Sequence, residues 1–441
     1  MYHTIVLGGG AGGLTASIGL ASAGKKVLLI EKEKLGGECT WSGCIASKSF
    51  ISAAKTSKNL KDVLEKTLKN VHKVGDSELP HVSNFKNIDL IIGEGSFIDK
   101  NSVIVNGTIY KGKNIVISTG SSPFIPNIKG LEKIDYLTNQ NFFYIKDDYC
   151  SIVMIGAGII SLELAFPLKK LGIDVTILEK SNLFLPNMDD EIRAFYSKRL
   201  KEENIDLFLN CEEIEILSFD KSNKKVLIKT NHRNFETEKV FISTGRVPNL
   251  KNLNLEKAGI EFNNKGIVVD RYMRTSSKNI FSIGDVASPL KFSHVAGYHG
   301  ETVVRNLLFP YIMKSIDYSN IPWTIFGETE VSKVGISEEE AKSKYKKIYT
   351  YTLDENNDRS LITFEKNFYL KIICDNKFNI VGALCIGERA GELIGFLQLM
   401  IGNKIKFYKA MKSVQAYPTY NYYIRNLSKK AYIDHLKSYL P

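Results

Sequence analysis

A glycine-rich turn between an apolar strand and a helix occurs twice in this chain of 441 residues, and no other feature limits the possible folds as much. At the first site the strand TIVL (4–7) leads into GGGAGG, a stretch compatible with a helix and the strand KVLLI (26–30). At the second, IVMI (152–155) leads through GAGIIS and a helical stretch to TILEK (176–180). Parallel strands joined by a helix form an open sheet, so each unit predicts a doubly wound α/β domain.

The first turn has the spacing of a dinucleotide-binding loop. Gly8, Gly10 and Gly13 follow G-x-G-x-x-G between strand and helix. Gly8 permits the tight turn, Gly10 lets the backbone approach a pyrophosphate, and Gly13 lets the helix pack on the strand. The helix N-terminus would bind the phosphates, and Glu31 would accept hydrogen bonds from a ribose. The alternative is a turn without a ligand, which the complete strand–helix–strand–acid context disfavours.

The second turn repeats this plan with one departure. Gly156 and Gly158 hold the first two positions, and Ser161 replaces the third glycine. A small residue still allows helix and strand to approach. Both units also end alike, in NIVISTG (114–120) and KVFISTG (239–245), which place Gly120 and Gly245 after an apolar strand. Two such units predict two bound dinucleotides.

Two of the six cysteines lie close together in GGECTWSGCIASK (36–48), and the other four are scattered. Six cysteines are too few for a structural disulfide framework in so long a chain. Cys39 and Cys44, where a loop enters a helix, can satisfy disulfide geometry. Once reduced, a thiolate at a helix start is stabilised by the helix dipole and by nearby cations. We therefore interpret the pair as a redox relay; two ordinary buried cysteines are the alternative.

The order of these motifs resembles one known family. The first glycine unit, the C-x-x-x-x-C pair followed by Lys48, the second glycine unit, STGRVPN (243–249) and FSIGDVA (281–287) occur as in the flavin-dependent pyridine nucleotide–disulfide oxidoreductases. That family includes lipoamide dehydrogenase, glutathione reductase and mercuric reductase. The resemblance covers essentially the whole chain, and the segment beginning IPWTIFGETEVSKVGISEEEA looks like the family's dimerisation domain.

The resemblance implies an α/β architecture of two doubly wound, Rossmann-like dinucleotide-binding domains plus a C-terminal α+β dimerisation domain. We expect an FAD-binding domain at 1–148, an NAD-binding domain at 149–248, a central segment returning to the FAD domain at 249–318 and an interface domain at 319–441. We also expect a homodimer.

The implied activity passes a hydride from NADH through FAD to the Cys39–Cys44 disulfide. Electrons would then reach a small-molecule or small-protein disulfide or a related acceptor. By resemblance Cys44 is the flavin-facing, charge-transfer thiol and Cys39 the interchange thiol. Glu179 ends the second strand of the second unit, where an acid accepts from the ribose 2′-hydroxyl and repels a 2′-phosphate, so NADH is favoured over NADPH. Lys180 beside it keeps that preference moderate.

Further site residues follow from the resemblance. Lys48 and Glu163 would form an ion pair near the flavin; two separate surface charges are the alternative. Asp285 would hydrogen-bond the ribityl chain, and the helix starting near Ser293 and His294 would point its N-terminus at the flavin. His294 is expected among the cofactor contacts, as a packing or positioning residue rather than a base. The other expected cofactor contacts are Gly37, Gly95, Gly120, Gly245 and Arg246.

The chain departs from the family at its C-terminal H-P-T-x-x-E signature, where it reads YPTYNY (417–422). Tyr417 replaces the histidine that acts as acid and base, and Tyr422 replaces the glutamate. A tyrosine with an ordinary pKa of about 10 is a poor base at neutral pH. Mercuric reductase resembles this chain in having a tyrosine here, but we expect neither its cysteine pair near the C-terminus nor its N-terminal metal-capture domain, which disfavours mercuric reductase proper. The absent histidine disfavours lipoamide dehydrogenase proper. Tyr417 is either a catalytic residue reaching the partner's cysteines or a structural filler.

Composition narrows the function classes. The formal net charge of +11 comes from lysines spread along the chain, so we expect no nucleic-acid partner. No apolar run has the length of a membrane span, no signal peptide precedes the first strand, and we expect a cytoplasmic protein. No histidine or cysteine spacing is typical of a metal site. The remaining alternatives are a metal-ion or quinone reductase, an NADH oxidase, and a non-enzymatic flavin-containing redox sensor.

Overall fold

The computed structural model describes residues 1–220 and 225–440, which form two compact units. Unit 1 comprises Met1–Phe184 with Asn204–Ile316, and unit 2 comprises Leu185–Glu203 with Asp317–Pro441. Both glycine-rich turns lie in unit 1. The domain boundaries expected from the sequence stay predictions.

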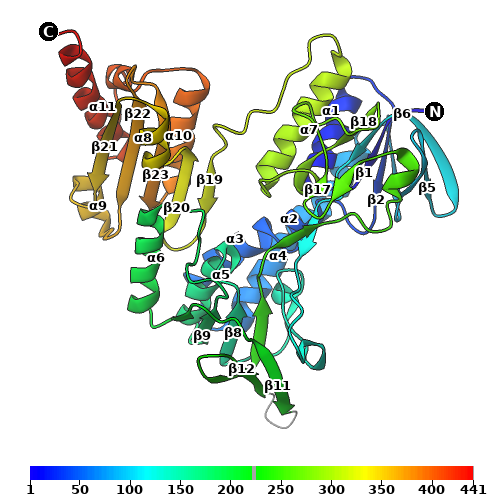
Figure 1. Cartoon of the computed structure of the whole chain (residues 1–441), viewed down its shortest axis with the longest axis horizontal. Helices are drawn as coiled ribbons and strands as arrows, with labels where there is room; N and C mark the ends of the chain where they lie inside the picture. The colour runs from blue at the N-terminus through cyan, green and yellow to red at the C-terminus, as the bar shows by residue number, and fades with distance from the viewer. Residues whose placement is uncertain (221–224, 441) are drawn as a thin grey trace. The chain divides into compact units, whose positions relative to one another are not determined.

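The first sheet of unit 1 has the strand order β3-β2-β1-β6-β5-β4, with β18 paired to β6 (Figure 1). Strands β1, β2, β3, β6 and β18 run parallel, whereas β4 and β5 extend the sheet as antiparallel strands. Its centre is apolar on both faces, as a parallel sheet covered by helices requires. The strands are β1 (Tyr2–Leu7), β2 (Val27–Glu31), β3 (Ile88–Ile92), β4 (Ser96–Asp99), β5 (Ser102–Val105), β6 (Thr108–Ile117) and β18 (Ile280–Ser282).

The helices next to the first sheet include those that carry Cys39 and Cys44. Helix α1 (Ala11–Ser22) packs beside α7 (Ser293–Leu308), and the two backbones meet where a Cβ on Gly300 would lie 2.8 Å from the Gly12 carbonyl oxygen (Figure 1). The short helix α2 (Gly37–Trp41) precedes α3 (Cys44–Ala54) and α4 (Leu60–Ser83).

The second sheet of unit 1 is parallel, in the order β10-β9-β8-β14. Its elements are β8 (Ser151–Ile155), α5 (Ile159–Lys170), β9 (Asp174–Leu178), β10 (Asp206–Phe208) and β14 (Lys239–Ile242). A small antiparallel sheet is formed by β11 (Glu215–Asp220), β12 (Lys225–Lys229) and β13 (Asn234–Thr237). Strand β7 (Ser121–Pro123), which follows the first sheet's β6, pairs with β15 (Arg246–Pro248), which follows β14. This β7–β15 pair joins the ends of the two glycine units.

Shorter elements complete unit 1. They are β16 (Phe262–Asn263), β17 (Gly266–Ile267) and the 3₁₀ turns η1 (Leu131–Lys133), η2 (Phe142–Tyr144), η3 (Leu255–Ala258) and η4 (Gly284–Val286). The predicted α/β class with two Rossmann-like units is confirmed.

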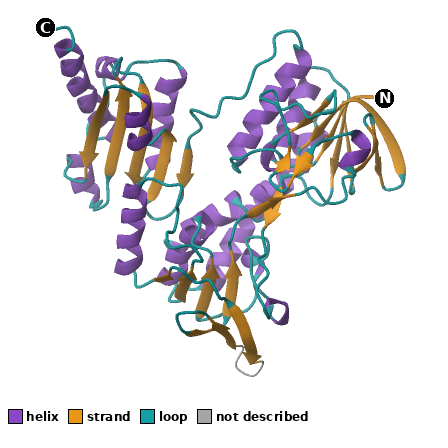
Figure 2. Cartoon of the chain, viewed as in Figure 1, coloured by secondary structure: helices purple, strands orange, loops and turns teal. Residues whose placement is uncertain are grey.

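Unit 2 is an antiparallel sheet with helices (Figure 2). Its strand order is β19-β20-β23-β22-β21. Its elements are α6 (Asp190–Glu202), β19 (Trp323–Ile325), β20 (Glu330–Gly335), α8 (Glu338–Lys344), β21 (Ile348–Asp354), α9 (Asp358–Thr363), β22 (Tyr369–Asp375), β23 (Ile380–Gly387), α10 (Ala390–Gly402), η5 (Phe407–Lys412) and α11 (Tyr420–Lys437). Ion pairs of two buried lysines, Lys333 with Asp189 and Lys371 with Glu191, fix the start of α6 to the sheet. The predicted α+β C-terminal part is confirmed.

Candidate active site

The first glycine loop has the geometry of a phosphate-binding loop. Gly8 has a φ of 101°, and Gly10 is the N-cap of α1 with no side chain capping it, so the first-turn amides are open to a ligand. A Cβ on Gly13 would lie 1.8 Å from the Gly8 carbonyl oxygen. The Glu31 carboxylate accepts a hydrogen bond of 2.6 Å from the Gly9 amide, which holds the loop against the end of β2.

The second loop repeats this geometry. Gly156 has a φ of 104°, and Gly158 is the N-cap of α5, again without a side-chain cap. The Ser161 hydroxyl is buried and donates to the Gly156 carbonyl at 2.6 Å, so a serine is accommodated where the motif has glycine. The Glu179 carboxylate accepts from the Ala157 amide at 2.8 Å, as Glu31 does in the first loop.

Both loops fit a dinucleotide. The uncapped helix N-termini offer amide donors, and the first loop is lined by backbone, because a Cβ on Gly37 would lie 2.9 Å from the Gly10 Cα. A carboxylate has lone pairs beyond those used by the loop amides, so Glu31 and Glu179 keep acceptor capacity for a ribose hydroxyl. Those ribose contacts stay predictions.

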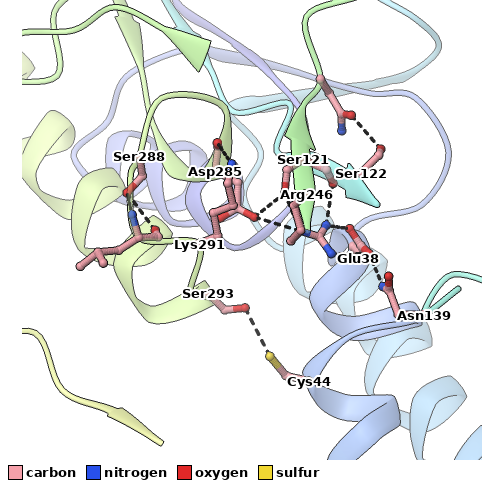
Figure 3. Close-up of polar contacts among 12 residues, drawn as sticks. Glu38, Cys44, Ser121, Ser122, Asn139, Arg246, Asp285, Ser288, Lys291 and Ser293 are labelled. Atoms are coloured by element: carbon pink, nitrogen blue, oxygen red, sulfur yellow. Dashed lines mark hydrogen bonds and ion pairs between the residues drawn. The ribbon is translucent and has the colours of Figure 1, made fainter. Parts of the chain in front are cut away.

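The two thiols lie in consecutive helices. Cys39 belongs to α2 and is half-buried, whereas Cys44 is exposed and is the first residue of α3, whose N-cap Gly43 carries no side chain. The Cys44 Sγ lies 3.6 Å from the Ser293 Oγ at the start of α7 (Figure 3). Both cysteines are free thiols in this structure.

The surroundings of Cys44 favour its thiolate. A hydrogen bond from Cys39, the positive charge of Lys48 and the Ser293 hydroxyl lower the pKa of Cys44 to about 6, against the opposing effects of partial desolvation by the surrounding protein and of Glu163. The pKa of Cys39 is raised far above its usual value, because Cys39 donates to Cys44 and is itself desolvated. At neutral pH the reduced pair therefore holds one thiolate, on Cys44, and one proton, on Cys39.

Lys48 and Glu163 form an ion pair between α3 and α5. The Lys48 Nζ lies 2.9 and 2.8 Å from the two carboxylate oxygens of Glu163. Only 6% of the Glu163 side chain is exposed, against 31% for Lys48. The structure thus joins these two residues, and their placement near a flavin stays a prediction.

A polar network runs from Asp285 to the thiol-bearing helix α2 (Figure 3). The Ser121 hydroxyl donates to Asp285 at 2.7 Å and accepts from the Arg246 Nε at 2.7 Å. The Arg246 guanidinium pairs with both carboxylate oxygens of Glu38, and Glu38 also accepts from the Asn139 amide. Arg246, expected as a cofactor contact, is therefore held next to Asp285 and α2.

The remaining expected cofactor contacts are three glycines outside helices and strands and one histidine in α7. Gly95 packs where a Cβ would meet the Leu7 side chain at 2.9 Å. Gly120 and Gly245 have φ values of 71° and 122° and precede β7 and β15. The His294 ring stacks on Phe292 with a centroid separation of 5.4 Å, as a packing residue would.

Tyr417 lies in unit 2 and is 60% exposed. Its hydroxyl donates to the Asp358 carboxylate at 2.8 Å, and this hydrogen bond raises the pKa of Tyr417 above its usual value. The Tyr422 ring packs edge-on against it at 5.2 Å. A phenol with a raised pKa is protonated at neutral pH and cannot serve as a base there.

Sequence reasoning missed Ser293, Glu38, Ser121 and Asn139. Ser293 carried a usable signal, because it directly precedes His294 at a predicted helix start. Glu38 directly precedes Cys39 inside the quoted motif, yet its partner is 208 residues away in sequence.

Two kinds of feature are absent from the described ranges, 1–220 and 225–440. No three His, Cys, Asp or Glu side chains there are grouped so as to hold a metal ion. No helix in the same ranges is both long and apolar enough to cross a bilayer.

Comparisons with known proteins agree on one family. Residues 2–300 match the profile described as "Pyridine nucleotide-disulphide oxidoreductase", and residues 321–427 match the dimerisation domain of that family. Mercuric reductase of Bacillus cereus is 31% identical over 415 residues, which cover 89% of this chain and 66% of that protein. Dihydrolipoyl dehydrogenase of Bacillus subtilis is 31% identical over 442 residues, covering 94% and 93%.

A solved structure is similar over the whole fold. The HOCl-induced flavoprotein disulfide reductase RclA from Escherichia coli superposes with a TM-score of 0.89 at 27% identity, covering 97% of this chain and 99% of that one. A Cu(II) complex of RclA matches with a TM-score of 0.88 at 26% identity, covering 96% and 98%.

Proposed function

The chain belongs to the pyridine nucleotide–disulphide oxidoreductase family, and from this membership we propose that it carries electrons from NADH through the Cys39–Cys44 pair to a small disulfide or a related oxidant. The family is composed of flavoproteins that depend on FAD and a pyridine nucleotide. The observation that supports the proposal most is the polarised thiol pair, with a Cys44 pKa of about 6 beside the Lys48–Glu163 ion pair.

Different residues of the chain would bind FAD and the nicotinamide dinucleotide. When bound, FAD supplies the path by which an electron pair from a reduced nicotinamide reaches a disulfide. We propose that the α1 N-terminus and Glu31 hold the FAD phosphates and ribose, and that Asp285 binds its ribityl chain. The α5 N-terminus and Glu179 would hold the nicotinamide dinucleotide.

The thiol chemistry balances in two exchanges. Two electrons and two protons convert the Cys39–Cys44 disulfide to two thiols, and the low pKa of Cys44 releases one of these protons at neutral pH. The Cys39 sulfur, having lost its proton, attacks one sulfur of the acceptor disulfide and expels the other as a thiolate. The Cys44 thiolate then attacks Cys39, which restores the protein disulfide and expels the second product thiolate.

The nicotinamide preference is proposed from Glu179. Its carboxylate stands at the end of β9, held by the Ala157 and Ser181 amides at 2.8 and 2.9 Å. A fixed negative charge there accepts from a ribose 2′-hydroxyl and repels a 2′-phosphate. Comparing kcat/KM for NADH and NADPH tests the preference, and a higher value for NADPH overturns it.

A metal ion is the second candidate acceptor, because its reduction would not require Tyr417 to act as a base. With its pKa raised by Asp358, Tyr417 does not take the Cys39 proton at neutral pH. A soft cation that binds thiolate sulfur displaces that proton by itself, so it needs no base.

The family's dimerisation domain indicates a homodimer. That Tyr417 reaches the partner's cysteines is part of the proposal, as is a cytoplasmic location. Sedimentation of the purified protein tests the dimer.

Anaerobic titration of the purified flavoprotein tests the function. NADH should bleach the flavin and produce a long-wavelength thiolate–flavin absorbance, which glutathione disulfide, lipoamide, Hg²⁺ or Cu²⁺ should then discharge. Turnover with the productive acceptor should be lost in Cys39→Ser and Cys44→Ser. Unchanged turnover in both variants refutes the relay. If only oxygen or a quinone reoxidises the reduced protein, the protein is an oxidase or a quinone reductase. If neither NADH nor NADPH reduces the flavin, the protein is a sensor.

A further inference from the structure

Helix α2 carries Cys39 but has little to hold it in place by itself. It spans only Gly37–Trp41, and its N-cap Gly36 and first residue Gly37 have φ values of 91° and 60°, in the left-handed region. A helix of one turn is unstable in isolation, because nucleation is unfavourable. Its position must come from contacts with other segments.

One anchor of α2 is apolar. The Trp41 ring packs where a Cβ on Gly75 of α4 would lie 2.4 Å away, and the Trp41 indole donates to the Leu35 carbonyl at 2.7 Å. This contact fixes the C-terminal end of α2. At the N-terminal end the Gly36 amide donates to the Gly9 carbonyl at 2.9 Å, so the backbone there is attached to the glycine loop, and a side-chain anchor follows at Glu38.

The second anchor is ionic, and it holds the residue directly before Cys39. The Glu38 carboxylate pairs through both oxygens with the Arg246 guanidinium, and the two side chains are only 22% and 19% exposed. A two-pronged carboxylate–guanidinium pair fixes orientation as well as distance, because two parallel hydrogen bonds must be made at once. The buried Asn139 amide donates to the same carboxylate.

Arg246 is in turn held by Ser121, on the side away from Glu38. It donates to the Ser121 carbonyl at 2.8 Å and to the Ser121 hydroxyl at 2.7 Å, and that hydroxyl donates to Asp285 at 2.7 Å (Figure 3). These bonds tie the guanidinium to Ser121 in β7 rather than to α2. The β7–β15 pair, which joins the ends of the two glycine units, thereby serves as the fixed point for α2.

We propose that Arg246 and Glu38 are positioning residues that hold the Cys39 sulfur within bonding reach of Cys44. This rests on the proposed redox role of the two cysteines and adds two residues that contact neither sulfur in an exchange step. The disulfide forms when Cys39 and Cys44 lose two electrons and two protons, and its stability depends on how closely the two sulfurs are held in the reduced state. Releasing the N-terminal end of α2 lowers that effective concentration and makes the disulfide easier to reduce.

Equilibration with glutathione measures this directly. The purified FAD-bound protein is incubated in mixtures of reduced and oxidised glutathione, quenched with iodoacetamide, and the Cys39–Cys44 disulfide fraction is read by mass spectrometry. In the exchange, two glutathione thiols give one glutathione disulfide and the protein disulfide gives two thiols. We expect Glu38→Ala and Arg246→Ala each to shift the equilibrium constant about tenfold toward the dithiol.

Matched variants separate positioning from general damage. Glu38→Gln keeps the side-chain volume and loses the charge, so it should move the equilibrium in the same direction by a smaller factor even if the alanine variants do not fold. The double variant Glu38→Ala/Arg246→Ala should be no worse than either single one, since both remove the same contact. Ser122→Ala, which removes only the neighbouring hydrogen bond of 2.7 Å to Asn249, should leave the equilibrium unchanged.

The outcomes are distinguishable from those of the functional proposal. Folded Glu38 and Arg246 variants with the wild-type equilibrium constant, or additive effects in the double variant, overturn the positioning role while the relay stands. Full turnover after Cys39→Ser and Cys44→Ser overturns the relay whatever the glutathione equilibrium shows.

Discussion

Replacing either member of the Lys48–Glu163 pair should move the pKa of Cys44, and the two changes should have opposite signs. Lys48 follows Cys44 by four residues in α3, which places the two side chains on one helix face about 6 Å apart. At an effective dielectric constant of about 20, a full charge at that distance favours the thiolate by about 3 kcal/mol, or about 2 pKa units. Because Lys48 is one-third exposed and shares its charge with Glu163, we expect about half of this effect.

Lys48→Gln should therefore raise the pKa of Cys44 from about 6 to about 7. Glu163→Gln removes a carboxylate that raises the pKa and leaves the lysine charge uncompensated, so the pKa should fall below 6. The sign of each pKa shift follows from which charge is lost. A change in desolvation alone would shift the pKa of Cys44 in the same direction in both variants.

Alkylation kinetics provide the assay. The reduced protein is treated with iodoacetamide at a series of pH values, and the labelling rate of the Cys44 peptide is fitted for its midpoint. Lys55→Gln serves as the matched control, because Lys55 lies exposed at the far end of α3 and should leave the midpoint unchanged. Midpoints that shift in the same direction for Lys48→Gln and Glu163→Gln, or that stay within 0.3 units of wild type, would refute the electrostatic argument.

Further changes probe the other contacts. Ser293→Ala should raise the pKa of Cys44 by about 0.5 units through loss of the 3.6 Å hydrogen bond, and Ser293→Thr should restore it, by the same alkylation assay. Asp358→Asn should lower the pKa of Tyr417, followed by tyrosinate absorbance against Tyr417→Phe. Burial lowers the pKa of His299 to about 4, so the unfolded chain binds a proton near pH 6.5 that the folded chain does not. Stability should be full above about pH 6.5 and fall toward pH 4, and His299→Gln should flatten this slope in urea denaturation.

The features that could be predicted from the sequence are those formed by residues close together in the chain. The two glycine units are contained in about thirty residues each, and their strand, turn, helix and strand follow from apolar runs and glycine spacing alone. Both fold as expected, with Ser161 accommodated through its bond to the Gly156 carbonyl. The close thiols were recognisable for the same reason, because only four residues separate Cys39 from Cys44.

Contacts between distant segments could not be predicted in this way. The Glu38–Arg246 pair joins residues 208 apart, and the Ser121–Asp285 bond joins residues 164 apart. Neither residue type is unusual at its place, so composition and periodicity contain no sign of the pairing. Only the fold, which brings β7 against β15, makes these side chains neighbours.

The positions of charge and proton at the thiol pair bear on the choice of acceptor. Lys48, Ser293 and Cys39 together place the negative charge on Cys44, and the remaining proton stays on Cys39, the sulfur expected to meet the acceptor. A family member with a histidine at the Tyr417 position can remove that proton with a base, whereas the Tyr417 phenol is held protonated by Asp358. Electron transfer to a disulfide should then be limited by loss of the Cys39 proton and should accelerate with rising pH. Transfer to a thiolate-binding metal ion should depend less on pH, since the ion itself displaces the proton, and the pH dependence of turnover with the two acceptor classes therefore decides between them.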